Sequence, residues 1–321
     1  MFVDHLYDKV LMAPLKAKET PSDELFIVSG YASATFVLRH LSEAKFANPN
    51  MKLHLIIGME FQRDEHPAYL RLLSKFQNSF FGYYYDGAPS VHAKAYCWYR
   101  NGEPNLGFAG SANYSQNGFL PNRQRNQMAE ASPSDIKKFF DSLLPDSTPI
   151  DEYEPPQINV KLRDYGEDVE PGKIEWIKEG VSVRISLLKR DGDLSLAGSG
   201  LNWGHRKNKL KRETNEAYLR IPKATHKVKG FLPPRAYSFT VLTDDNESFD
   251  CTIQQQGDKG FSTTNNNSDL GRYFRRRLGV RDGAVVYKQD LLDYGRTDYL
   301  LTKLNDEAFY LDFSAPEVEL Q

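Results

Sequence analysis

The first half of the chain alternates short apolar runs with amphipathic stretches. Residues 24–29 (ELFIVS) and 51–58 (MKLHLIIG) are continuous apolar runs of the length expected for buried strands. Residues 34–46 and 67–76 repeat their apolar positions every three or four residues, which predicts two amphipathic helices, the first with Ser33 as N-cap. Strands that alternate with helices predict an α/β domain built on a layered sheet.

Other segments of this half extend the pattern. Residues 5–16 and 133–144 predict further helices, and residues 79–86 (SFFGYYYD) predict an aromatic strand. The aromatic run also suits a platform for stacking bases, although burial in the sheet explains it with fewer assumptions. Residues 91–100 alternate with period two and end at an Asn-Gly turn, which predicts a hairpin with a return strand at residues 106–109. The hairpin makes the expected sheet mixed.

The second half has a different pattern, in which short runs with period-two alternation recur about every ten residues. Strands of this kind, separated by turns rich in Gly, Pro, Asn and Asp, predict an all-β barrel or sandwich. One short helix is expected at residues 268–278. The predicted strands include residues 181–188, 216–222, 237–243, 248–256 and 284–292.

A compositional change separates the two halves. Residues 145–173 are rich in Pro, Asp and Glu, which predicts an acidic linker rather than part of a packed core. We therefore expect a first domain at residues 1–150, a linker at residues 151–175 and a second domain at residues 176–321.

Composition and cysteine usage narrow the class of protein. Hydrophobic residues make up 40% of the 321 positions and charged residues 26%, as in globular proteins. No run approaches the roughly eighteen consecutive apolar residues of a membrane span, and the first residues lack the pattern of a signal peptide. Cys97 and Cys251 show neither disulfide nor metal spacing, so we expect a reducing, cytoplasmic location and no membrane partner.

The positive charge is concentrated locally, although the formal net charge is only −2. Residues 202–235 contain ten Lys and Arg against two acids, Glu213 and Glu216. A second cluster of five arginines lies within residues 272–281. Basic clusters on an acidic body predict surfaces that bind phosphates.

Candidate chemistry is concentrated in an H-x-K pair, His92 and Lys94, and a G-S-x-N sequence with Ser111 and Asn113. Residues two apart on a strand share a face, so the two pairs are expected to meet at one end of the hairpin. The ammonium would neutralise a phosphate oxygen, the hydroxyl and amide would donate hydrogen bonds, and the imidazole would attack phosphorus. Neither a carboxylate cluster nor a His/Cys ligand set lies nearby, so we expect neither metal nor cofactor.

The four residues together are more specific than either pair. His205 and Lys207 form another H-x-K, but no G-S-x-N follows it at a comparable distance. Ordinary polar positions on strands remain the alternative explanation.

H-x-K followed by G-S-x-N resembles the signature of the phospholipase D superfamily. Within it the chain is most similar to metal-independent restriction endonucleases of the NgoFVII type, and residues 180–314 resemble their B3-like DNA-recognition domain. The resemblance covers nearly the whole chain. It implies an α/β phospholipase D-like mixed sheet with helices on both faces, followed by an all-β B3-like pseudobarrel domain. Tyr99 departs from the family's longer H-x-K-x4-D form, which disfavours a lipid hydrolase.

The resemblance also implies roles for individual residues. His92 would be the nucleophile that forms a phosphohistidine, with Lys94, Ser111 and Asn113 holding the phosphate. The family has a downstream carboxylate that orients the histidine, and Glu130 is the candidate for it; Gln127 is the alternative position.

The number of motifs predicts an oligomeric state. One histidine cannot act as nucleophile and as leaving-group acid in the same step, and the chain has one full motif. We therefore expect a homodimer through the catalytic domain, with one composite site across the two-fold axis.

Two loops of the second half match, by their order along the chain, the arms with which B3-like domains grip the major groove. They are residues 198–218 and 263–279. Arg pairs with guanine, Asn with adenine and Lys with phosphate. The candidate DNA-binding residues are Arg206, Lys207, Asn208, Lys209, Lys211, Arg212, Asn266, Asn267 and Arg272.

Together these features predict a type II-like restriction endonuclease that cuts double-stranded DNA at a specific short sequence. The alternatives are a nonspecific phosphodiesterase or nuclease, and a DNA-binding subunit of a multi-protein restriction system. The resemblance implies a helicase-like ATPase and a cognate methyltransferase as partners in such a system. The chain has no G-x-x-x-x-G-K-[ST] sequence, so any ATP dependence would come from another polypeptide.

Overall fold

A computed structural model shows the chain as two compact units, Met1–Gln157 and Ile158–Gln321. Within the described residues, no helix is both long and apolar enough to cross a membrane. The predicted linker lies largely outside those residues, so its bounds stay a prediction. The structure describes residues 5–17, 21–59, 65–120, 124–154, 169–178, 181–196, 198–206, 212–235, 237–254 and 257–315.

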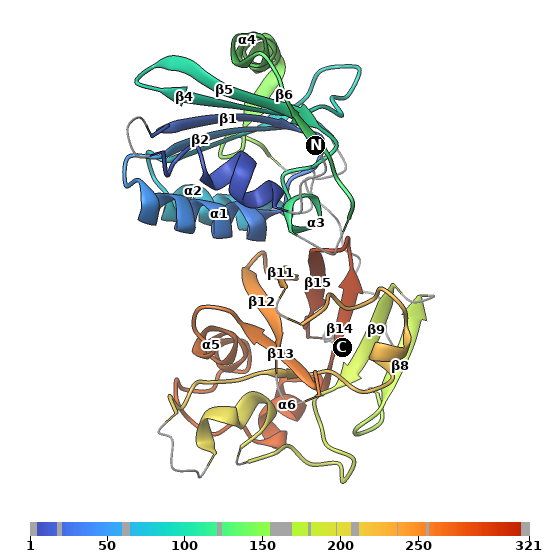
Figure 1. The fold of residues 1–321 in the computed structure, drawn as a ribbon. Coiled ribbons are helices and arrows are strands. Elements are labelled where there is room, and N and C mark those ends of the chain that lie inside the picture. Colours follow the sequence, from blue (N-terminus) through green and yellow to red (C-terminus); the bar gives the residue numbers. More distant parts are fainter. Residues whose placement is uncertain are drawn as a thin grey trace. The chain divides into compact units, whose positions relative to one another are not determined.

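The first unit is a seven-stranded mixed sheet with helices on both faces (Figure 1). Strands β1, β2 and β3 are parallel, whereas β4 runs antiparallel to β1 and forms the predicted hairpin with β5. Helices α1 and α2 cover one face and α4 covers the other, which confirms the predicted α/β class. In sheet order the strands are β6 (Met128–Glu130), β5 (Glu103–Gly110), β4 (Lys94–Arg100), β1 (Glu24–Ser29), β2 (Lys52–Ile57), β3 (Phe80–Tyr85) and β7 (Ser147–Pro149); the helices are α1 (Ala34–Ala47), α2 (His66–Lys75), α3 (Gln116–Phe119) and α4 (Pro133–Leu143).

The segment before β1 differs from the predicted amphipathic α-helix. It forms a π-helix over Tyr7–Met12, in which the amide of Ala13 donates to the carbonyl of Asp8. The carbonyl oxygen of Val10 accepts a 2.7 Å hydrogen bond from the indole Nε1 of buried Trp98. A tertiary hydrogen bond to a helix carbonyl is one reason for a wider local turn, and the sequence pattern alone does not reveal it.

The face of the sheet covered by α1 buries a histidine. His40 of α1 is fully buried, and its Nδ1 lies 2.5 Å from the hydroxyl of Tyr114. Burial disfavours the charged imidazole and lowers the pKa of His40 from 6.5 to about 4. Since Tyr114 follows Asn113 directly, this buried pair supports the edge of the sheet that carries the predicted site.

We expect the fold to lose stability in acid through His40. In the unfolded chain the imidazole binds a proton near pH 6.5, but in the folded protein it does so only near pH 4. Stability is therefore highest above pH 6.5 and falls as the pH drops toward 4, by up to about 3 kcal/mol for this group. Chemical denaturation of wild type and His40→Gln at a series of pH values measures the difference. If the free energy of unfolding changed with pH in the same way for both proteins, His40 would not be the source of the acid sensitivity.

In the described part of the second unit, one eight-stranded sheet is accompanied by the α-helices α5 and α6 (Figure 1). Its neighbouring strands are antiparallel except for the parallel pair β11 and β15. This largely β architecture agrees with the predicted B3-like class. In sheet order the strands are β10 (Leu219–Arg220), β13 (Gly260–Thr263), β12 (Ser248–Gln254), β11 (Ser238–Thr243), β15 (Ala308–Asp312), β14 (Asp298–Lys303), β9 (Ser182–Ser186) and β8 (Ile174–Lys178); the helices are α5 (Ser268–Arg277) and α6 (Lys288–Tyr294).

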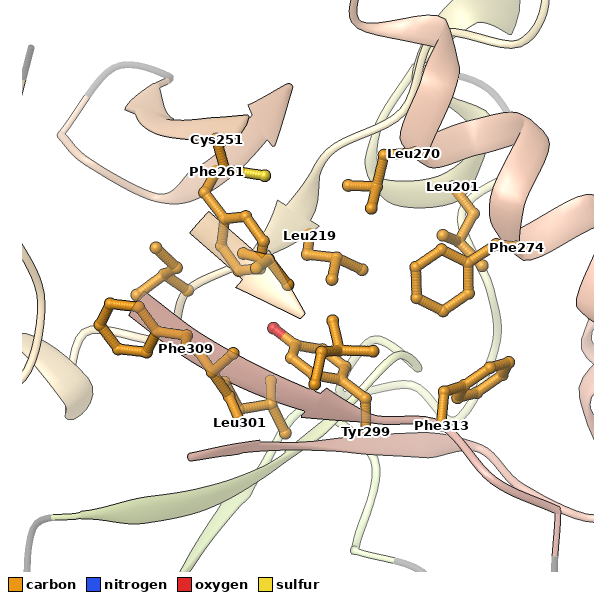
Figure 2. Packing of buried hydrophobic residues seen from close by; sticks show 14 of the residues in the cluster. Leu201, Leu219, Cys251, Phe261, Leu270, Phe274, Tyr299, Leu301, Phe309 and Phe313 are labelled. Atoms are coloured by element: carbon orange, nitrogen blue, oxygen red, sulfur yellow. The ribbon is translucent and has the colours of Figure 1, made fainter. Parts of the chain in front are cut away.

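The core of this unit joins the sheet to the long connection between β9 and β10. Figure 2 shows Leu201 of that connection beside Leu270 and Phe274 of α5, with Phe309 and Tyr299 of the sheet in the same cluster. All five side chains are buried. The connection is therefore anchored to α5 by apolar packing.

One predicted strand is wrong. Residues 284–292 were expected as a strand, but the chain forms α6 from Lys288 instead. Val286 is held by a side chain, since its amide donates to Asn202 Oδ1 at 2.9 Å and its carbonyl accepts from Asn202 Nδ2 at 2.7 Å. Asp290 then accepts from the amide of Tyr287 at 2.7 Å and caps the helix. A distant asparagine thus replaces the strand partner that the pattern implied.

Candidate active site

His92 lies at the edge of the first sheet where β1 and β2 end and β4 begins. It precedes β4 instead of lying on it, so the strand predicted from residue 91 begins three residues later, at Lys94. The amide of Gly30 donates to the carbonyl of Ala93 at 2.9 Å, and the amide of Val91 donates to the carbonyl of Gly58 at 3.0 Å. The backbone around His92 is therefore held between the ends of β1 and β2, while its side chain is exposed.

Lys94 is the buried member of the H-x-K pair. It is 8% exposed, and its Nζ donates to the backbone carbonyl of His92 at 2.7 Å. Burial lowers the pKa of Lys94 below its ordinary value because it penalises the charged ammonium. The Lys94 ammonium is therefore linked to the backbone of His92, which lies just outside the strand.

Asn113 is fixed to the end of β1. Its Oδ1 accepts from the amide of Tyr31 at 3.3 Å. The Ser29 hydroxyl donates to the carbonyl of Tyr31 at 2.5 Å and accepts from the amide of Tyr114 at 3.0 Å. With Oδ1 engaged in this way, the two Nδ2 protons are the donors that Asn113 can offer to a phosphate.

Ser111 is engaged with the segment that precedes β6. Its hydroxyl donates to Asn126 Oδ1 at 2.9 Å and accepts from the amide of Gln127 at 3.0 Å. An open pocket of about 440 Å³ adjoins it, and Arg125 is the charged residue in its lining. The residues that line it are Ala109, Gly110, Ser111, Arg125, Asn126, Gln127 and Ala129.

Glu130 is not brought to His92 within one chain. It pairs with Phe108 on β5, and Phe108 pairs with Tyr96 on β4. Tyr96 is four residues beyond His92, which corresponds to about 13 Å along a strand at roughly 3.3 Å per residue. The role of Glu130 as the orienting carboxylate stays a prediction.

Another carboxylate occupies the N-terminus of α1. Glu65, which is buried, accepts from the amide of Ala34 at 2.9 Å and from the hydroxyl of Tyr31 at 3.3 Å. Its charge complements the helix dipole there, so this helix end binds a side chain and not a substrate phosphate. Within the described ranges, no group of three His, Cys, Asp or Glu side chains is arranged to hold a metal ion.

The predicted site residues did not include Ser29, Tyr31, Arg125 and Asn126. The amide of Tyr31 and the hydroxyl of Ser29 act through the turn that follows β1, and turns carry little periodicity. Arg125 and Asn126 lie just before Gln127, the alternative position that the sequence offered for the orienting carboxylate. Their position beside a candidate site residue is the sequence signal that could have identified them.

Two glycines let the backbone of His92 approach the sheet. A Cβ on Gly30 would lie 2.9 Å from His92 Cδ2, and a Cβ on Gly58 would collide with the carbonyl oxygen of Val91.

We expect Gly30→Ala to reduce cleavage by about 100-fold, since a 1 Å misplacement costs on this order. We expect a larger loss from Gly58→Ala, because it displaces backbone. Cleavage rates and melting temperatures test this; unchanged cleavage in both variants would contradict it.

Of the predicted DNA-binding residues in the first arm, the structure describes two, and only one of these has a side-chain partner among the described residues. Arg206 is exposed. Arg212 stacks on the ring of Trp203 at 4.0 Å and forms a 2.5 Å ion pair with Glu216. Lys207, Asn208, Lys209 and Lys211 lie outside the described residues.

The residues of the second arm have partners inside the protein. Asn266 accepts from the amide of Ser268 at 3.1 Å, and Asn267 accepts from the hydroxyl of Ser262 at 2.9 Å. Arg272 pairs with three carboxylates, Glu213 at 2.5 Å, Asp269 at 3.6 Å and Asp282 at 3.8 Å. Their part in DNA binding stays a prediction, and it would require them to exchange these partners.

The arginines that follow on α5 do not form the free basic surface that the sequence predicted. Arg275 is fully buried. Arg276 pairs with Glu247 at 2.5 Å, and Arg277 pairs with Asp244 at 2.7 Å. Because Arg275 is buried and the charges of Arg276 and Arg277 are compensated, these three arginines stabilise the fold.

Family models match both halves of the chain. Residues 4–154 match the NgoFVII restriction endonuclease N-terminal PLD domain, and residues 175–305 match the NgoFVII C-terminal B3-like DNA-binding domain. The structure of NucT from Helicobacter pylori aligns with 16% sequence identity and a TM-score of 0.32. The alignment covers 43% of this chain and 87% of the NucT chain. Nuc from Salmonella typhimurium, a phospholipase D family member, is 10% identical, with coverages of 45% and 89% and a TM-score of 0.32. Among curated proteins the comparison finds no match.

Proposed function

Because this chain belongs to the NgoFVII-type restriction endonucleases of the phospholipase D superfamily, we propose that it cuts double-stranded DNA at a specific short sequence without a metal ion. It is a phospholipase D-type nuclease with a DNA-binding domain. The proposal concerns its sequence specificity, its metal independence and its mechanism.

The observation that carries the proposal is the arrangement at the sheet edge. The imidazole of His92 is exposed and lies against Gly30, and the next residue, Tyr31, holds Asn113 through its amide. The Lys94 ammonium is bonded to the His92 carbonyl. A cation, an amide and an unencumbered imidazole at one edge suit a phosphodiester, and the set offers donors instead of the carboxylates that a metal would need.

The chemistry proceeds in two displacements. A nitrogen of His92 attacks phosphorus, a P–N bond forms and the P–O bond to the leaving strand breaks. The leaving oxygen takes a proton from the second histidine, which comes from the other subunit of a homodimer. Water then attacks the phosphohistidine and gives a proton to the second histidine, the P–N bond breaks, and the 5′ or 3′ phosphate is released with both histidines restored.

Lys94 and Asn113 stabilise the charge that develops on the phosphate oxygens. Ser111 joins them if its hydroxyl leaves Asn126, its present acceptor. Glu130 is proposed to orient a histidine. The amount of phosphohistidine trapped by an alkaline denaturing quench, and the cleavage rates, are measured for Glu130→Gln and Gln127→Glu. Full activity in Glu130→Gln removes Glu130 from the mechanism.

Digestion of several plasmid DNAs in excess EDTA tests the proposal. We expect discrete fragments, the same from each preparation of one plasmid. A featureless smear would instead indicate a nonspecific nuclease. DNA that is bound but uncut, and that is cut only when an ATPase partner is added, would indicate a subunit of a multi-protein restriction system.

A further inference from the structure

Positive charge in the second unit is of two kinds. On α5 and in the neighbouring connection, arginines are paired with carboxylates, as Arg272 is with Glu213 and Arg276 with Glu247. Residues 217–243, in contrast, contain no Asp or Glu at all. Cations that the local sequence leaves uncompensated therefore gather in that segment.

The segment folds against the turn between β12 and β13. The amide of Ile221 donates to the carbonyl of Lys259 at 2.7 Å, and His226 Nε2 lies 2.9 Å from the carbonyl oxygen of Asp258. A polar pocket of about 200 Å³ lies where the two segments meet, lined among others by Lys229, Arg235 and Asp258. We call residues 223–235 together with residues 257–259 the 223–235 surface.

The three lysines of this surface lack acidic partners among the described residues. Lys223, Lys229 and Lys259 are exposed, and among the described residues none of the three forms an ion pair. Arg235 is paired with Asp258 at 3.6 Å, with side chains 60% and 41% exposed. An exposed pair at that distance contributes little, about 0–1 kcal/mol, and gives way easily to another anion.

Asp306 also lies near the surface, through Lys303, and it is already paired. Lys303 donates to the carbonyl of Gly230 and forms a 2.5 Å ion pair with Asp306. Asp306 therefore compensates Lys303 and not the three lysines. The 223–235 surface keeps a net positive charge within a chain whose formal net charge is −2.

We propose that the 223–235 surface binds the backbone phosphates of duplex DNA. The proposal rests on the proposed function, in which DNA is the substrate. The cations are exposed and spread over two segments, which suits a repeating polyanion better than a single phosphate enclosed by convergent donors. Lysines act as point charges without fixed geometry, so they hold DNA in place and leave sequence reading to other residues.

Two triple variants with equal charge change test the proposal. The first is Lys223→Gln, Lys229→Gln and Lys259→Gln. The matched control, Lys138→Gln, Lys173→Gln and Lys189→Gln, removes three cations that already pair with Asp135, Glu170 and Asp191. The dissociation constant of each full-length protein for a fluorescent 30-base-pair duplex is measured by anisotropy at several NaCl concentrations, after melting curves confirm folding.

We expect the slope of log K against log salt to fall by about 2–3 in the first variant, close to 0.9 for each lost phosphate contact. Affinity at low salt should fall by at least tenfold, and the control should keep the wild-type slope. Equal slopes for wild type and the first variant, or equal losses in the two triple variants, would overturn the proposal. No DNA binding by the wild type would instead overturn the DNA-binding function itself.

Discussion

Replacement of His92 by alanine is expected to abolish DNA cleavage, by on the order of 10⁴-fold or more, while DNA binding is retained. His92 is the exposed imidazole at the sheet edge, and its removal leaves no nucleophile for the phosphohistidine. Its side chain supports little of the fold, because Lys94 bonds to its carbonyl and not to its ring. Initial cleavage rates in EDTA and a gel shift on the same duplex separate catalysis from binding.

His5→Ala is a matched control, since His5 is also an exposed histidine of the first unit and lies outside the proposed site. It should cleave as the wild type does. Cleavage by His92→Ala at more than about a tenth of the wild-type rate would contradict the role of His92, since loss of a nucleophile costs far more.

The same variant tests the composite site. If each site uses one histidine from each subunit, a mixed dimer with one alanine is inactive. After subunit exchange with an equal amount of His92→Ala, a fixed amount of wild type should lose about half its activity, because half of its chains then sit in mixed dimers. Unchanged activity after exchange, with mixed dimers demonstrated by tagging, would show that each subunit carries a complete site.

The largest expected effect on stability is that of Arg275→Met. The guanidinium of Arg275 is fully buried and donates only to backbone carbonyls. Nε bonds to Ala284 at 2.8 Å and Nη1 to Gly271 at 3.1 Å, while Nη2 lies 3.3 Å from the oxygens of both Leu201 and Thr214. Arg275 thus ties α5 to the connection before β10 and to the turn before α6.

Methionine fills much of the same volume but offers no donor. Buried carbonyls left without partners cost about 1–3 kcal/mol each, less where another donor remains. We expect a loss of about 3 kcal/mol, a large fraction of the stability of a small domain. Urea unfolding followed by the fluorescence of Trp176 and Trp203, which both belong to the second unit, measures it.

Arg276→Met is the matched control on the same helix. Arg276 is 56% exposed and pairs at the surface with Glu247, so its loss should cost no more than about 1 kcal/mol. Arg275→Lys should resemble Arg275→Met, because one ammonium cannot reach four carbonyls on three segments. Equal stabilities for Arg275→Met and Arg276→Met would contradict the proposed clamp.

The sequence by itself determined the architecture and predicted which residues are reactive. The period of the apolar positions predicted β1, α1, β2 and α2 closely, because amphipathic helices and buried strands are defined by local periodicity. The spacing of His92, Lys94, Ser111 and Asn113 predicted the phosphate site and the family, because the chemistry needs those side-chain types in that order.

Tertiary structure alone decided how those residues are held and which charges are free. His92 lies outside its strand because the ends of β1 and β2 hold the backbone on either side of it, and these contacts join residues far apart in the chain. Glu130 is separated from His92 by strand register, which composition does not encode. The arginines of α5 looked like a phosphate-binding cluster, but distant carboxylates compensate Arg276 and Arg277. Charge is local in sequence, whereas its compensation depends on which segments meet in space.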